Sequence, residues 1–127
     1  MTHIPQQAIK VFEAGIYLPM LLTVIDRDLT CIEEGNFKFK EPYIQLLSRV
    51  RQNIEEEFLK AKQSFKKEKM KLKRGLSDAL FTEYYFYYGE LIELRRYSNI
   101  RLRNQSEWLL MQFMLHEGTT LASLAVD

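Results

Sequence analysis

The chain has 127 residues, enough for one domain with its own hydrophobic core, and a formal net charge of only +1. Its single cysteine, Cys31, excludes an intramolecular disulfide and a thiolate metal cluster, and favours a reducing, cytoplasmic setting. We expect no signal peptide and no membrane span, because the longest apolar stretch, residues 14–25, contains Pro19 and is too short to cross a bilayer.

The first predicted element is a helix from about Pro5 to Glu33, with Gly35 just past its end. Pro19 lies inside this helical pattern and removes a backbone donor, so we expect it to kink or split the helix. After a loop, a long second helix is predicted over residues 41–74. Its apolar residues form one narrow stripe, which is typical of a two-stranded seam, and Gly75 is expected to end it.

A third helix is predicted over residues 77–97, with Ser77 and Asp78 as its cap, and a fourth begins at a fresh cap formed by Ser98 and Asn99. The fourth is expected to stop at Gly118. Four main helices with short connections favour an all-α fold. The sequence therefore predicts an antiparallel helical bundle that forms a single domain over residues 1–127.

The segment FTEYYFYY, residues 81–88, is unusually rich in aromatic rings. On a helix most of these rings divide into two seams that would face two neighbouring helices, so we interpret them as core residues. Base stacking is the alternative, but the exposed side of such a helix carries Glu83, Glu90 and Glu93, whereas stacking platforms are basic. Phe86 does not fit, because it falls among those glutamates. A strand is not favoured, since the run shows no period-2 alternation.

Residues 60–74 carry a formal charge of +7, because eight cations accompany the single acid Glu68. A solvated helix end explains part of this cluster, since cations are favourable at a helix C-terminus. The alternatives are contacts with nucleic acid phosphates, an anionic lipid surface or an acidic protein. The candidate residues for an anionic partner are Lys60, Lys62, Lys66, Lys67, Lys69, Lys71, Lys73 and Arg74.

The last predicted helix is apolar on nearly every side, which indicates either a central position or an interface. A bundle of four helices has little room for a fully buried one, so a homodimer contact is a reasonable expectation. The candidate interface residues are Trp108, Leu110, Met111, Phe113 and Met114.

No familiar catalytic or cofactor-binding pattern is present. The two histidines, His3 and His116, are far apart in sequence, and no Glu precedes a His by three residues as in carboxylate metal sites of bundles. The sequence contains neither a glycine-rich phosphate loop nor a nucleophile elbow. We therefore expect no metal, no cofactor and no catalytic residues.

Three segments, YLPMLLTVIDRD (17–28), FKFKEPYIQLL (37–47) and NIRLRNQ (99–105), are similar to the YhjD-like small proteins of Bacillus-type bacteria. The resemblance covers most of the chain in the same order. It implies a small helical protein of the bacterial cytoplasm, and it carries no active-site residues over to this sequence.

Together these observations predict a non-enzymatic protein that acts through protein–protein contacts, as a homodimer. The alternative is a nucleic-acid-associated protein that uses the basic residues 60–74.

Overall fold

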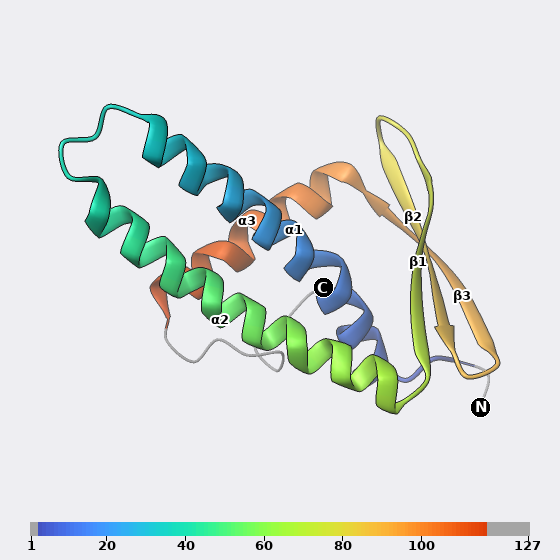
Figure 1. Cartoon of the computed structure of the whole chain (residues 1–127). Helices are drawn as coiled ribbons and strands as arrows, with labels where there is room; N and C mark the ends of the chain where they lie inside the picture. The colour runs from blue at the N-terminus through green and yellow to red at the C-terminus, as the bar shows by residue number, and fades with distance from the viewer. Residues whose placement is uncertain (1–2, 117–127) are drawn as a thin grey trace.

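The structure, a computed structural model, describes residues 3–116 as an α+β fold with three helices and a three-stranded antiparallel sheet (Figure 1). In chain order the elements are α1 (Gln6–Glu34), α2 (Lys40–Lys67), β1 (Met70–Ser77), β2 (Phe81–Tyr88), β3 (Leu91–Ser98) and α3 (Asn99–Leu115). The strand order is β1-β2-β3. The predicted all-α bundle of four helices is therefore wrong, because the middle of the chain forms a sheet.

The first helix, α1, continues through Pro19 as one element, so the predicted split does not occur. Pro19 cannot donate to the carbonyl of Gly15, but the helix retains its burial along the core. By length and composition α1 is apolar enough to cross a membrane, although 56% of its most apolar window is buried inside the protein. That extent of burial is typical of a core helix.

The second helix, α2, lies antiparallel beside α1 (Figure 1) and ends at Lys67, not at Arg74 as predicted. Lys69 has a φ of 53°, in the left-handed region, and it marks the change from helix to strand. Beyond it, lysines alternate with Met70 and Leu72 at the spacing of a strand. Gly75, predicted to stop a helix, lies within β1.

The predicted third helix is a β-hairpin. Gly89 in its turn has a φ of 59°, and a Cβ there would meet nothing within 4 Å, so backbone conformation and not space favours glycine. Asp78, predicted as a helix cap, instead accepts backbone N–H bonds from Leu80 and Phe81 in the turn between β1 and β2, both at 2.8 Å.

The predicted cap before the last helix is confirmed. The Ser98 hydroxyl accepts a hydrogen bond of 3.1 Å from the backbone N–H of Arg101, which satisfies a free donor at the start of α3. The predicted stop at Gly118 lies outside the described residues.

The sheet packs against the helices with one face only (Figure 1). The β2 residues on that inward face, Thr82, Tyr84 and Phe86, are buried, whereas their neighbours in sequence are not. The ring of Phe86 is fully buried and stacks on Phe12 of α1, with ring centroids 4.4 Å apart and planes 5° from parallel. The residue that did not fit a helix is therefore the centre of the core.

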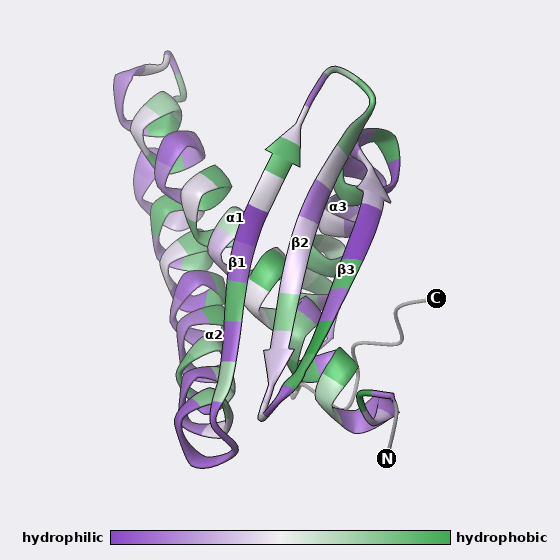
Figure 2. Ribbon diagram, turned by 90° about the vertical axis from the view of Figure 1, so that its right-hand side faces the viewer, coloured by the Kyte–Doolittle hydropathy of each residue, from purple (hydrophilic) through white to green (hydrophobic). Residues whose placement is uncertain are grey.

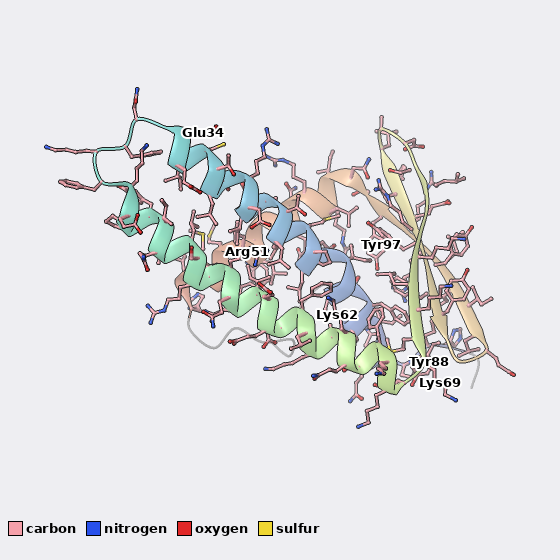
Figure 3. All side chains as sticks on the ribbon, viewed as in Figure 1. Glu34, Arg51, Lys62, Lys69, Tyr88 and Tyr97 are labelled. Carbon is pink, nitrogen blue, oxygen red and sulfur yellow. The ribbon has the colours of Figure 1, made fainter. Side chains whose placement is uncertain are left out.

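A buried polar pair also joins α1 to the sheet. Glu13 of α1 is only 6% exposed, and its carboxylate accepts a hydrogen bond of 2.8 Å from the hydroxyl of Tyr97 on β3. Figure 3 labels Tyr97 where the sheet meets the helices. Burial raises the pKa of Glu13, while the Tyr97 hydrogen bond and the charges of Arg95 and Arg101 oppose that rise. Burial, and then the Glu13 carboxylate, raise the pKa of Tyr97. At neutral pH the ionised form of Glu13 is thus disfavoured by its surroundings.

Phe86→Ala should lower the free energy of unfolding by about 3–5 kcal/mol, because it removes a fully buried ring from a packed core. Tyr85→Ala, at the next position in β2, should cost much less, because Tyr85 faces away from the helices. Urea unfolding followed by circular dichroism measures both. Equal losses would contradict the assignment of the two rings to opposite faces.

Glu13→Gln should raise the melting temperature at about pH 7, because glutamine carries no charge and still offers an oxygen to Tyr97. The raised pKa of Glu13 means that the folded state binds more protons than the unfolded state as pH rises above 4.5, so wild-type stability falls across that range. The gain from Glu13→Gln should therefore shrink at about pH 4.

Thermal unfolding of both proteins at the two pH values tests this, with Glu56→Gln on the exposed side of α2 as the control. A Glu13→Gln variant less stable than wild type at neutral pH would show that the charge is net stabilising beside Arg95 and Arg101.

Candidate binding sites

A groove runs along α1 between the sheet and α3, and we call it the α1–α3 groove. Its volume is about 770 Å³, within the range of small-molecule sites. Most of its wall is apolar. The apolar residues that form it are Ile16, Pro19, Met20, Val24 and Leu110.

Polar groups gather where the groove meets the sheet. Arg74 of β1, Tyr84 of β2 and Arg103 of α3 line both the groove and a smaller adjoining hollow of about 360 Å³. Arg74 lies directly opposite Tyr84 in the β1–β2 register. Burial raises the pKa of Tyr84, and the charge of Arg74 opposes that rise. This end of the groove therefore presents two guanidinium groups and a hydroxyl to one space.

Two carboxylates also line the α1–α3 groove, Asp28 and Glu107, but neither lines the adjoining hollow. Asp28 lies eight residues beyond Met20 on α1, which is about 12 Å along the helix axis. The groove is thus cationic at the sheet end, apolar along its length and acidic farther along α1 and α3.

The second candidate surface is the outward face of the sheet, which none of the three described helices covers (Figure 2). The strand register places two rows of three residues across it: Lys73, Tyr85 and Leu94 in one, and Lys71, Tyr87 and Ile92 in the other. Ile92 is 63% and Leu94 52% exposed. Each row therefore runs from a lysine on the edge strand β1, over a ring, to an exposed aliphatic residue on β3.

Gly75 helps to flatten this face. A Cβ at Gly75 would lie 2.9 Å from a ring carbon of Tyr85, so the absent side chain leaves space for the ring over β1. The rings of Tyr85 and Tyr87 have centroids 6.4 Å apart and planes tilted by 33°. The two tyrosines thus form a continuous aromatic patch on the central strand.

The predicted basic cluster does not form one surface. The end of α2 carries Lys60, Lys62, Lys66 and Lys67, and the turn after it carries Lys69. Lys71 and Lys73 project from the outward face of β1. Arg74 lines the α1–α3 groove. Some of these cations are engaged within the chain: Lys60 forms an ion pair of 2.8 Å with Glu57, and Lys62 lies 4.5 Å from the ring centroid of Phe58.

The predicted interface residues of α3 are also divided. Phe113 is buried in the core, and Leu110 lines the α1–α3 groove. Trp108, Met111 and Met114 are exposed on the other side of the helix. Helix α3 is therefore apolar nearly all round because one side packs in the core and the other side is exposed. The predicted interface included residues from both sides.

Sequence reasoning did not place Tyr85, Tyr87, Ile92 and Leu94 on an outward sheet face, where Ile92 and Leu94 are exposed and the two tyrosines are partly buried. It also did not identify Tyr84 and Arg103 as groove residues. The alternation of lysine with Met70 and Leu72 was the available signal for a strand at β1. A strand there, followed by Gly89 at a turn, would have indicated the hairpin. Within residues 3–116 no group of three or more His, Cys, Asp or Glu side chains is placed to hold a metal ion.

Comparison with known proteins identifies relatives of the whole chain. The family model described as "YhjD protein" matches residues 3–118. The Bacillus subtilis (strain 168) protein named "Uncharacterized protein YhjD" is 31% identical over 114 residues, which cover 90% of this chain and 95% of that protein. No solved structure matches significantly. The resemblance noted in the sequence is thereby confirmed, and the chain belongs to the YhjD family.

Proposed function

We propose that this member of the YhjD family is a cytoplasmic binding protein, not an enzyme, and that it works as a homodimer in which two copies pack through the outward faces of their sheets. The observation that carries this proposal is the uncovered pair of rows on that face, with Ile92 and Leu94 more than half exposed. Burial of an apolar surface of this kind against a partner is favourable in free energy, because it removes the surface from water.

The positions of the charges favour a second copy as the partner. Lys71 and Lys73 lie on the edge strand β1, whereas the apolar residues lie on β2 and β3. A two-fold axis near β2 and β3 places Ile92 and Leu94 of one chain on the rings of the other. The lysines of both chains then lie at the rim in contact with water, which is the usual arrangement of an interface.

The size of the face bears on the strength of the dimer. Strands of eight residues, at about 3.3 Å per residue and about 4.8 Å between strands, give a face of a few hundred Å². That is less than the roughly 800 Å² per partner of a standard interface. Exposed Leu76 and Leu80, at the β1–β2 turn, extend the apolar surface. We therefore expect a dimer that dissociates on dilution.

Replacement of both Ile92 and Leu94 by Lys should convert the protein to a monomer, because it places four cations in the centre of the contact. Sedimentation velocity over a wide range of concentration measures this. Thermal unfolding should change little, since both side chains are exposed in the single chain.

Two matched variants locate the contact. Leu59→Lys on α2 changes an equally exposed leucine away from the sheet and should leave the dimer intact. Met111→Lys with Leu115→Lys tests the exposed side of α3 and should also leave it intact. A dimer lost only in the α3 variant would move the interface to α3, and a wild-type monomer at every concentration would reject the dimer.

Binding of single-stranded nucleic acid is the second candidate function, and one arrangement on the same face favours it. Tyr85 and Tyr87 lie beside Lys73 and Lys71 across two strands, which combines rings for stacking with cations for phosphates. Two of the three glutamates that argued against stacking on a helix lie away from this patch: Glu90 is in the turn, and Glu93 is opposite the buried Phe86. Glu83 lies on the same face of β2 as Tyr85, two residues from it.

If nucleic acid binds here, Lys71→Gln with Lys73→Gln should weaken binding of a fluorescent single-stranded oligonucleotide at low salt, because phosphate contacts are lost. Lys66→Gln with Lys67→Gln, on the end of α2, is the matched control and should have little effect. The Ile92→Lys, Leu94→Lys variant should retain or strengthen binding of the oligonucleotide. No detectable binding by wild type at low salt would reject this function.

A further inference from the structure

We propose that the α1–α3 groove is a binding site for an amphipathic carboxylate, of which a free fatty acid is the simplest kind, with its head group at Arg74 and Arg103. This inference is independent of the contact at the outward sheet face, because the groove lies on the helix side of the sheet. It rests on three features of the groove: unpaired cations, an unbonded hydroxyl and an apolar wall.

The two arginines lack carboxylate partners within the described part of the chain. Arg74 donates a 3.2 Å hydrogen bond to the hydroxyl of Ser77, and Arg103 donates a 3.4 Å bond to the side-chain carbonyl of Asn104. Neither forms an ion pair with any of residues 3–116, unlike Arg51, which pairs with Asp26 and Glu55. A guanidinium group binds a carboxylate through parallel N–H donors, so the sheet end of the groove can hold an anionic head group.

Tyr84 provides the second observation. Its side chain is only 7% exposed, it lines both the groove and the adjoining hollow, and its hydroxyl makes no hydrogen bond within residues 3–116. Among these residues the buried side-chain oxygen without a partner is the hydroxyl of Tyr17, so the hydroxyl of Tyr84 retains some contact with solvent and is open to a ligand. A carboxylate held by Arg74, which lies opposite Tyr84 in the sheet, would accept a hydrogen bond from that hydroxyl.

The rest of the groove suits an apolar chain. Ile16, Pro19 and Val24 of α1 face Leu110 of α3 across it, and Met20 lies at its junction with the polar end. The hydroxyl of Ser106 is 3.6 Å from the sulfur of Met20, so the one hydroxyl of α3 that lines the groove already contacts the protein. Asp28, about 12 Å beyond Met20 along α1, repels an anion from the other end and favours a head group at Arg74 and Arg103.

Isothermal titration calorimetry with laurate below its micelle concentration tests the site. Laurate should bind wild type at least about tenfold more tightly than dodecylammonium, which has the same chain and the opposite charge. Arg74→Gln with Arg103→Gln should weaken laurate binding by about tenfold or more. Arg27→Gln with Arg49→Gln makes the same change in net charge at exposed positions outside the groove, and should leave laurate binding unchanged.

Tyr84→Phe separates binding from folding. The hydroxyl makes no hydrogen bond to any of residues 3–116, so its removal should leave the melting temperature unchanged while laurate binding weakens several-fold. Equal affinity for laurate and dodecylammonium, or equal loss in both pairs of arginine variants, would indicate adsorption to exposed apolar surface and overturn the proposal. Absence of laurate binding would overturn it as well.

The Ile92→Lys, Leu94→Lys variant keeps this test distinct from the proposed dimer. It should lose self-association and retain laurate binding, because neither residue lines the groove. Loss of laurate binding in that variant would show that the ligand occupies the outward face of the sheet, contrary to the proposal.

Discussion

The stacking of Phe86 on Phe12 is the contact on which the rest of the architecture depends. It attaches the central strand β2 to the most buried stretch of α1, and it decides which residues of β2 face the helices. Since side chains alternate along a strand, a core position for Phe86 places Tyr84 on the same side and Tyr85 and Tyr87 on the other. A slip of one residue would exchange the two sets. The core, the groove and the outward face are consequences of one register.

The same alternation explains why the helices were predictable and the sheet was not. The apolar residues of α1 and α2 recur at helical spacing, so both helices were found, but α2 was predicted to end at Arg74 and ends at Lys67. In β2 the period of two is hidden, because Phe86 and Tyr84 point inward while Tyr85 and Tyr87 point outward and are also aromatic. A strand that is apolar on both faces shows no contrast from which the period can be read.

The basic segment illustrates how one wrong boundary changes a functional prediction. On an uninterrupted helix the cations from Lys60 to Arg74 would flank a single stripe and act together. The left-handed residue Lys69 ends that helix and reverses the chain into β1. Beyond this point Lys71 and Lys73 face outward and Arg74 faces the helices, so the cluster separates into a solvated helix end, part of the outward face and one arginine in the groove. Charge counted along the sequence predicted a patch because it ignored this change of direction.

The α1–α3 groove and the outward face of the sheet are connected through the edge strand β1. Lys73 and Arg74 are neighbours in sequence, yet they lie opposite Tyr85 and Tyr84 and therefore face different sites. After Arg74 the register of β1 against β2 shifts: Arg74 pairs with Tyr84 and Ser77 pairs with Thr82, so three steps along β1 match two along β2. Gly75 lies in this irregular segment, and the ring of Tyr85 lies against it. A larger residue at position 75 would meet the ring of Tyr85, and that ring would then have to move away from β1. Two consecutive residues of the edge strand thus supply a cation to each site, Lys73 to the outward face and Arg74 to the groove, and the glycine that follows them leaves space for Tyr85 on the outward face.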